Sequence, residues 1–178
     1  MGFYSTPAAA AVDVRSGISQ CGPGQYCDDG VALLCAGGTY STSFGRSSAC
    51  TDACLPGYFC PNGTGTLTAV NHCGSRSFYC PEGSVAPVNT SSGFYALATA
   101  EGLYFGQAEC EAGYFCVSGL RSSCPSGRYG NTLSQTSSMC TGNCSAGYFC
   151  PAGSTLQTQL PCGSVAVYCP SVSAVLLL

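Results

Sequence analysis

Charged side chains are scarce in this sequence. Lys, Arg, Asp and Glu together account for 7% of its 178 residues and leave a net charge of −3. A soluble monomer normally carries about a quarter of its residues as charged groups, so something else must cover this surface or keep it in solution. Covalent glycans and neighbouring subunits are the two candidates. The small net charge and the lack of any basic run argue against nucleic acid as a partner.

Long apolar runs are also missing. No stretch approaches the ~20 apolar residues that a membrane-spanning helix requires, so no transmembrane segment is predicted in this chain. The start, Met1–Ser5, has neither the basic residues nor the apolar core of a secretory signal. We expect the chain to be a processed product or a piece of a longer protein, because the disulfides predicted below form in the secretory pathway.

Side chains for catalysis or metal binding are few. Nucleophilic catalysis requires a nucleophile, a base and an orienting group together, yet His72 is the only histidine and is interpreted as an exposed loop residue. Asp28-Asp29-Gly30 lacks the alternating oxygen ligands of a calcium loop and is more typical of a turn. Glu109 and Glu111 flank Cys110 in only one of the two repeats described below. We therefore predict no enzyme activity, no cofactor and no metal site.

Cysteine, in contrast, is abundant. Sixteen cysteines in 178 residues are typical of a disulfide scaffold. Zinc or iron–sulfur sites need clustered Cys-x2-Cys pairs or accompanying histidines, whereas the close spacings here are Cys-x3-Cys and Cys-x5-Cys. We predict disulfides, and therefore an extracellular or cell-surface location. The predicted half-cystines are Cys21, Cys27, Cys35, Cys50, Cys54, Cys60, Cys73, Cys80, Cys110, Cys116, Cys124, Cys140, Cys144, Cys150, Cys162 and Cys169.

The cysteines form two series of eight in nearly constant step. Cys21 and Cys110 are 89 residues apart, Cys54 and Cys144 are 90 apart, and the other pairs share one of these two offsets. This register indicates a tandem duplication, with one cysteine-rich repeat in residues 1–91 and a second in residues 92–178. Eight cysteines can pair in many ways, so the connectivity stays open. The same pairing should hold in both repeats.

One phrase dominates both repeats. Cys54–Gly63 returns as Cys144–Gly153, and shorter copies begin at Cys21 and Cys110. Its glycine is interpreted as a position that needs positive φ or close chain approach, and its aromatic residues as packing bodies between subrepeats and subunits. The predicted packing aromatics are Tyr58, Phe59, Tyr114, Phe115, Tyr148 and Phe149.

No segment has a sustained helical period. Short aromatic pieces between Gly and Cys predict small two-stranded hairpins, and residues 84–92 are expected to be a short extended junction. The expected fold is small and disulfide-rich, mostly irregular with short β-hairpins, and its two tandem repeats are expected to form an elongated rod.

The order of these motifs resembles a known family. Cys-x2-Gly-x-Tyr/Phe-Cys, then Cys-x2-Gly-x-Tyr, then Cys-x3-Cys-x2-Gly-Tyr-Phe-Cys-Pro-x-Gly is similar to the ephrin-receptor-like cysteine-rich repeat, over nearly the whole chain. The segment Tyr79–Pro87 looks like the version in very large surface proteins of protists and algae. The resemblance implies an extracellular, disulfide-braced, rod-like or filament-forming module, and it brings no catalytic residues.

Three acceptor patterns for N-glycosylation occur, at Asn62, Asn89 and Asn143. Asn143 is the weakest candidate because Cys144 follows it directly and is predicted to be bridged. Unmodified polar loops are the alternative at each site. Glycans at these positions would supply the solubility that charge does not.

The predicted function is structural. Tandem register, sparse charge and abundant glycine and aromatic residues suggest a repeat subunit of an extracellular filament, appendage or cell-surface coat, assembled head-to-tail into a homopolymer or longer array. The alternative is a ligand-binding or adhesion fragment of a cell-surface receptor ectodomain.

Overall fold

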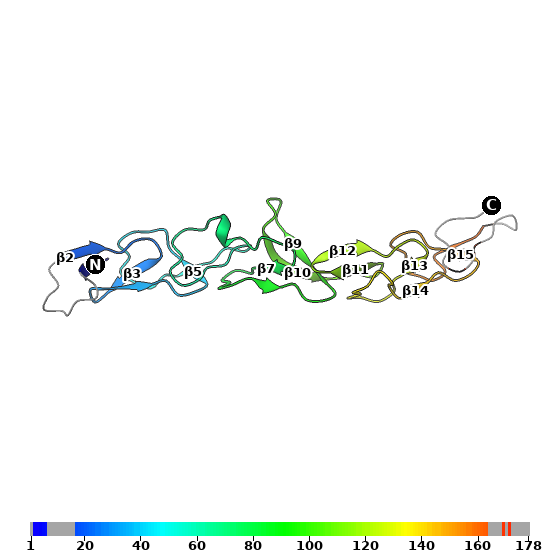
Figure 1. Cartoon of the computed structure of the whole chain (residues 1–178), viewed down its shortest axis with the longest axis horizontal. Helices are drawn as coiled ribbons and strands as arrows, with labels where there is room; N and C mark the ends of the chain where they lie inside the picture. The colour runs from blue at the N-terminus through cyan, green and yellow to red at the C-terminus, as the bar shows by residue number, and fades with distance from the viewer. Residues whose placement is uncertain (1, 7–16, 164–168, 170, 172–178) are drawn as a thin grey trace. The chain divides into compact units, whose positions relative to one another are not determined.

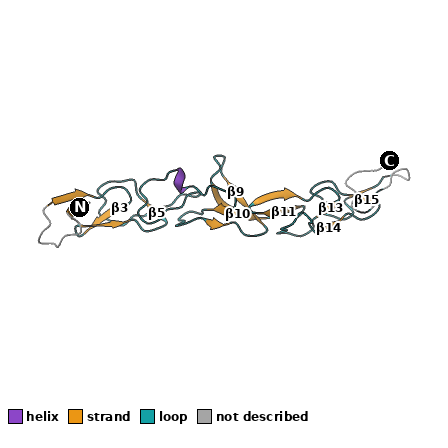
Figure 2. Cartoon of the chain, in the orientation of Figure 1, coloured by secondary structure: helices purple, strands orange, loops and turns teal. Residues whose placement is uncertain are grey.

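The protein is built from short strands joined by turns and loops (Figure 1, Figure 2). The computed structural model describes residues 2–6, 17–163, 169 and 171. In these residues the regular elements are sixteen strands and one 3₁₀ turn, Ala69–Asn71. The strands are β1 (Phe3–Thr6), β2 (Gly17–Gln20), β3 (Gln25–Asp28), β4 (Val31–Leu34), β5 (Thr39–Tyr40), β6 (Asp52–Ala53), β7 (Phe78–Tyr79), β8 (Val88–Asn89), β9 (Phe94–Ala98), β10 (Tyr104–Glu109), β11 (Tyr114–Val117), β12 (Leu120–Ser123), β13 (Arg128–Tyr129), β14 (Gly142–Asn143), β15 (Tyr148–Phe149) and β16 (Leu160–Pro161).

Each strand pairs with the strand next to it along the chain, so every sheet in the described residues has two strands. The pairs β1–β2, β3–β4, β5–β6, β11–β12, β13–β14 and β15–β16 are antiparallel. Isolated two-stranded ribbons are marginally stable in water, so the hairpins need further support. The predicted disulfide-rich fold, mostly irregular with short β-hairpins, is confirmed.

The hairpin β3–β4 turns through Asp29 and Gly30, both of which have positive φ, at 45° and 74°. Positive φ at both central residues defines the type I′ turn, which favours Asp-Gly. Ser118 and Gly119 repeat this geometry between β11 and β12, with φ of 49° and 74°. The interpretation of Asp28-Asp29-Gly30 as a turn is confirmed.

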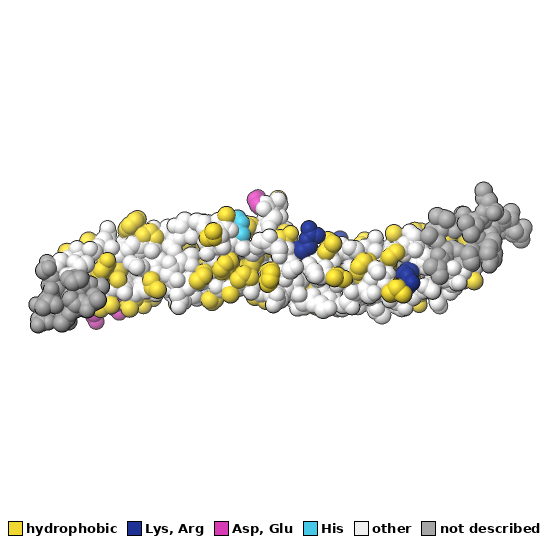
Figure 3. Space-filling view, in the orientation of Figure 1, with side chains coloured by type: hydrophobic (Ala, Val, Ile, Leu, Met, Phe, Trp, Pro, Cys, Tyr) yellow, Lys and Arg dark blue, Asp and Glu magenta, His cyan; other side chains and the backbone are white. Residues whose placement is uncertain are grey.

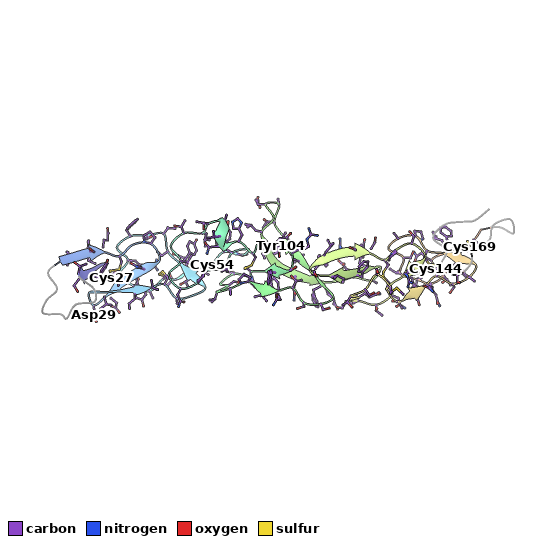
Figure 4. All side chains as sticks on the ribbon, viewed as in Figure 1. Cys27, Asp29, Cys54, Tyr104, Cys144 and Cys169 are labelled. Atoms are coloured by element: carbon purple, nitrogen blue, oxygen red, sulfur yellow. A yellow bond between two sulfur atoms is a disulfide. The ribbon has the colours of Figure 1, made fainter. Side chains whose placement is uncertain are left out.

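The described chain forms two compact units. Unit 1 comprises Met1–Val88 and Ala98–Gly106, and unit 2 comprises Asn89–Leu97 and Gln107–Leu178. The hairpin β9–β10 therefore places its tip in unit 1 and its outer residues in unit 2. The tip is fixed in unit 1 by a hydrogen bond from the Cys80 N–H to the carbonyl of Tyr104, at 3.0 Å. Tyr104 is labelled in Figure 4.

All sixteen cysteines are paired, and each bonds to the cysteine next to it along the chain. The bridges close loops with sequence separations of 6 to 16 residues. Both series pair in the same order, as the constant spacing predicts. The pairs are Cys21–Cys27, Cys35–Cys50, Cys54–Cys60 and Cys73–Cys80, then Cys110–Cys116, Cys124–Cys140, Cys144–Cys150 and Cys162–Cys169.

The core consists of these bridges. In the described part of the chain, every buried hydrophobic residue is a cysteine, and fourteen of the sixteen belong to this group. Large apolar side chains, such as Ile18 and Val70, are exposed instead, by 75% and 82%. A thin core of this kind cannot hold a fold without cross-links, so sulfur pairs take the place of an aliphatic interior.

A repeated backbone hydrogen bond links each bridge to a glycine that precedes it in the chain. The first cysteine of every bridge donates its N–H to the carbonyl of a glycine 11 to 19 residues earlier, at 2.8–3.0 Å. The glycines, in chain order, are Gly2, Gly24, Gly38, Gly57, Gly93, Gly113, Gly127 and Gly147. The duplicated repeat therefore contains four subrepeats, which makes eight in all. Each subrepeat runs from such a glycine to the cysteine that bonds back to it.

Seven of these glycines have φ between 75° and 88°. In each case the residue after the glycine donates its N–H to the carbonyl three residues earlier, at 3.0–3.2 Å. Positive φ at the third residue defines the type II turn, in which glycine is favoured. The predicted need for positive φ at the motif glycine is confirmed. Gly38, Gly93 and Gly127 form the same turn although no cysteine follows their aromatic residue.

The expected extended conformation of the junction is confirmed in part. The junction 84–92 contains the two-residue strand β8, and the start of the chain forms β1 and β2 as a hairpin. Residues 7–16 between those two strands lie outside the described part.

Gly113→Ala tests the close approach at the glycine turn. A Cβ at Gly113 would meet the carbonyl oxygen of Gly153, and φ there is 86°. Positive φ alone costs an alanine about 1–2 kcal/mol, and the backbone clash adds to this. We expect Gly113→Ala to lower the free energy of unfolding, measured with urea on the non-reduced protein, by at least ~1 kcal/mol more than the control.

The matched control is Gly102→Ala. Gly102 has φ of 80°, but an added Cβ meets no described atom within 4 Å. Equal losses in the two variants would show that backbone conformation alone, and not chain approach, selects glycine at position 113.

Candidate functional site

The predicted packing aromatics lie in pairs directly after the motif glycine, and all six are half-buried. The Tyr58 ring meets the His72 ring edge to face, with centroids 4.8 Å apart. The Tyr114 ring meets the guanidinium of Arg121. Tyr58 and Tyr114 thus contact side chains of their own unit, and packing between subrepeats and subunits stays a prediction.

The prediction that His72 is exposed is wrong, because His72 is half-buried. An isolated antiparallel bridge pairs its backbone with Tyr58, and this pairing brings the two rings together. In the second repeat the residue opposite the aromatic is Pro161, which pairs with Tyr148 in the hairpin β15–β16. The position is therefore structural in both repeats.

The most elaborate side-chain cluster in the described residues lies in unit 2, around Arg121 on β12. The Arg121 guanidinium carbon is 4.9 Å from the Tyr95 ring centroid and 4.8 Å from that of Tyr114. Its Nη1 donates to Glu111 Oε1 at 2.9 Å, and the Tyr95 hydroxyl donates to the same oxygen at 3.0 Å. Cation–π contacts and the shared carboxylate therefore fix the arginine between two rings. We call these four residues the arginine cluster.

The arginine cluster fastens β9 to the hairpin β11–β12. Tyr95 forms an isolated parallel bridge with Gly119, and the N–H of Ala96 donates to the Gly119 carbonyl at 3.0 Å. In the first repeat the backbone contact is retained, because Ser5 donates to the carbonyl of Gly30 at 3.0 Å.

The side chains of the arginine cluster are particular to the second repeat. By the cysteine register, the counterparts of Glu111, Tyr114 and Arg121 are Gly22, Gln25 and Ala32, and Tyr4 is the counterpart of Tyr95. Of the four side chains, only this tyrosine has an equivalent in the first repeat. The second repeat therefore adds a charged clamp to a contact that the first repeat makes through the backbone and the Ser5 hydroxyl.

The arginine cluster shifts the ionisation of two of its members. The pKa of Glu111 is lowered, first by a hydrogen bond from its own backbone N–H and further by Tyr95 and Arg121, against the opposing effect of desolvation. The pKa of Tyr95 is raised, chiefly because its hydroxyl donates to Glu111. Glu111 Oε2 is buried and has no hydrogen-bond partner among the described residues. The cluster thus favours an ionised carboxylate beside a neutral phenol.

Glu109 and Glu111 do not act as a pair. Glu109 Oε1 accepts a hydrogen bond from the Ser134 hydroxyl at 2.6 Å, whereas Glu111 faces Arg121 and Tyr95. Each carboxylate has its own structural partner. Among the described residues, no group of three or more His, Cys, Asp or Glu side chains is arranged to hold a metal ion.

The three candidate glycan acceptors are all exposed. Asn62 occupies the second position of a Pro-x-Gly turn, and its Oδ1 accepts from the N–H of Gly37 at 2.7 Å. Asn89 ends β8. Asn143 lies in β14 opposite Arg128, directly before the bridged Cys144.

Two pockets of unit 2 have polar linings. One, of about 290 Å³, lies along residues 132–137 and Cys140. The other, of about 180 Å³, lies between Tyr129, Asn131 and the loop 155–158. Amide and hydroxyl side chains dominate both linings, and neither lining contains Lys, Arg, His, Asp or Glu.

No protein-family model matches this chain, and no curated protein matches it either. None of the helices in the described residues has the length and apolar character needed to cross a membrane. The resemblance to the ephrin-receptor-like repeat therefore stays a prediction.

Tyr95→Phe tests the arginine cluster. A pKa that folding lowers contributes stability above the ordinary glutamate range, and this contribution is lost as the pH falls through the folded pKa. The raised pKa of Tyr95 adds a contribution that is lost only when alkaline pH ionises the phenol. We expect Tyr95→Phe to cost about 1 kcal/mol of unfolding free energy near neutral pH and progressively less below ~pH 4.5.

The measurement is urea unfolding of the non-reduced protein over a series of pH values. Tyr4→Phe, at the equivalent position of the first repeat, serves as control because its counterpart of Glu111 is Gly22. A loss that is the same at every pH in both variants would contradict the role assigned to Glu111.

Proposed function

We propose that this chain is a structural repeat subunit of an extracellular filament, appendage or cell-surface coat, assembled head-to-tail. The observation that carries the proposal is the eightfold glycine–cysteine hydrogen bond described above. In repeat architectures each unit is stabilised mainly by its immediate neighbours. A backbone contact that recurs eight times in register along the chain is the pattern expected of a repeated structural material.

The sulfur core supports the same proposal. Eight bridges and no free cysteine are typical of proteins that work in oxidising compartments. Disulfides also protect an exposed, thin structure against unfolding without a large interior. The predicted extracellular or cell-surface location follows from this chemistry.

The surface composition supports assembly. Figure 3 shows one face of the molecule, on which Lys, Arg, Asp and Glu side chains are few and isolated. Exposed large apolar side chains occur in both repeats, among them Phe44 at 67% and Leu133 at 57%. Apolar residues that are scattered singly over a surface need no special explanation. Because only 7% of the residues here are charged, however, the surface suits contacts with neighbouring copies.

Electron microscopy of negatively stained native material tests the proposal. We expect unbranched filaments or ordered sheets in non-reducing buffer, and their loss after reduction and alkylation of the sixteen cysteines. Discrete monodisperse particles at every concentration would overturn the proposal. A co-purifying soluble partner on such particles would support the alternative, a receptor ectodomain fragment.

We further propose that glycans cover part of the surface, at Asn62 and Asn89 in particular. Turns equivalent to that of Asn62 carry Glu82 and Ala152 at its position, so the turn itself does not require asparagine. Asn143 is a poorer acceptor, since it lies in a strand directly before a bridged cysteine.

Intact mass spectrometry tests the glycan proposal. The native protein is expected to exceed the 18.0 kDa of the polypeptide, and Asn62→Gln combined with Asn89→Gln is expected to remove most of the excess. Asn143→Gln alone should change the mass little. A native mass equal to that of the bare chain would end the proposal.

A further inference from the structure

The smaller polar cleft of unit 2 is a candidate binding site. It encloses about 180 Å³ and is lined by Tyr129, Asn131, Thr155, Leu156, Gln157 and Thr158. These six side chains supply two amides, two hydroxyls, one phenol and one small apolar surface. None of them carries a formal charge at neutral pH.

We propose that this cleft binds a neutral saccharide unit. Sugar hydroxyls both donate and accept hydrogen bonds, and amide and hydroxyl side chains offer both functions. The apolar C–H face of a sugar ring matches an aromatic or aliphatic wall, which Tyr129 and Leu156 provide. A charged ligand would find no countercharge in this lining and would lose hydration without compensation.

The loop that forms one wall is held in place by its backbone. Gln159 Oε1 accepts hydrogen bonds from the N–H groups of Thr155 and Leu156, both at 3.1 Å. The carbonyl of Gln157 accepts from the N–H of Ser145 at 2.9 Å. Because the backbone of the loop is already fixed, its side chains can bind a ligand without the cost of ordering the loop.

The opposite wall is oriented by Thr141. The Thr141 hydroxyl donates to Asn131 Oδ1 at 2.9 Å and accepts from the backbone N–H of Asn131 at 3.0 Å. Gln135 Nε2 donates to the same hydroxyl at 3.0 Å. Since the amide group is planar, fixing Oδ1 toward Thr141 turns Nδ2 away from it. Asn131 therefore has its donor group available for a ligand.

Strand geometry explains why the adjacent cation does not enter the cleft. Arg128 and Tyr129 are neighbours on β13, so their side chains point to opposite faces. Arg128 Nη1 donates to the carbonyl of Met139 at 3.0 Å. Tyr129 lies opposite Gly142 on β14, and the position of a Cβ at Gly142 is 3.5 Å from the tyrosine ring. The small partner leaves room for the ring that lines the cleft.

The size of the cleft sets the size of the ligand. Pockets that enclose a drug-sized molecule typically measure about 300–1,000 Å³. A cleft of about 180 Å³ is suited to a single sugar ring, either free or at one position of a longer chain. A dissociation constant in the millimolar range, ~1–10 mM, is expected for such a contact.

The first repeat provides an internal comparison. By the cysteine register, the counterpart of Asn131 is Thr42 and that of Gln157 is Leu67 or Thr68, so both amides are absent there. The variant Asn131→Thr with Gln157→Leu places in the second repeat residue types that the first repeat already has in the corresponding segments. This variant removes the proposed amide contacts to the ligand with the least risk to folding.

The proposal is tested by titrating the intact, non-reduced, ¹⁵N-labelled chain with N-acetylglucosamine, methyl mannoside, methyl galactoside and xylose. The NMR chemical shifts of its backbone and side-chain amides are followed. At least one sugar is expected to cause saturable shifts of the loop amides at 155–158 and of the side-chain amides of Asn131 and Gln157. We expect Asn131→Thr with Gln157→Leu to weaken sugar binding at least ~10-fold. The control is Thr66→Ala, a substitution of an exposed residue in the first repeat, which should leave the affinity unchanged.

Four outcomes would overturn the proposal. Absence of saturable shifts with all four sugars, or equal shifts with glycerol, would show that the cleft has no sugar selectivity. Saturable shifts caused only by a short neutral peptide, such as trialanine, would assign the cleft to peptide instead. Retention of full sugar affinity in the doubly substituted variant would place the binding site elsewhere. None of these results depends on whether the protein forms filaments.

Discussion

The structure depends on two kinds of cross-link, disulfide bridges within short loops and backbone hydrogen bonds between them. Each disulfide closes a loop of only 6 to 16 residues, so no bridge joins one distant part of a unit to another. In the loop-entropy description, such bridges contribute about 2–3 kcal/mol each. Neighbouring loops are joined instead by backbone hydrogen bonds, among them the bond from a leading cysteine to the turn glycine of the preceding loop, as from Cys35 to Gly24. The half-cystines supply the buried volume, and the glycines allow the chain to approach closely enough for that bond.

The two repeats use this common frame for different surfaces. β4 in the first repeat is Val31-Ala32-Leu33-Leu34, whereas β12 in the second is Leu120-Arg121-Ser122-Ser123. Alanine in the first strand is thus replaced by the arginine that Glu111 and two tyrosines hold. In the polar cleft, Gln157 likewise stands where the first repeat has Leu67 or Thr68. Because the cysteines and turn glycines stabilise the fold, the side chains between them can differ from one repeat to the other, as is usual for repeat proteins.

Patterns within a few residues of a cysteine could be predicted from sequence. The Gly-Tyr-Phe-Cys motif predicts the positive φ at Gly57 and Gly147, and the Cys count predicts a sulfur core. The pairing could not be deduced, since it depends on which half-cystines meet in space. The arginine cluster was missed because three separate segments build it, and the pairing of β11 with β12 and the bridge between Tyr95 and Gly119 bring them together. His72 was misplaced for a related reason, as its environment is set by Tyr58, fourteen positions earlier in the chain.

The order of pairing has a consequence for biosynthesis. Proteins are made from the N-terminus at about 5–20 residues per second, and cysteines enter an oxidising lumen in sequence order. Since every cysteine is joined to its immediate predecessor or successor, each second cysteine to emerge finds its native partner as the last thiol still unpaired. Oxidation can then keep pace with translocation, one loop at a time, and slow reshuffling of mispaired bridges is avoided. A chain of such subrepeats can be lengthened by duplication without making its maturation any harder.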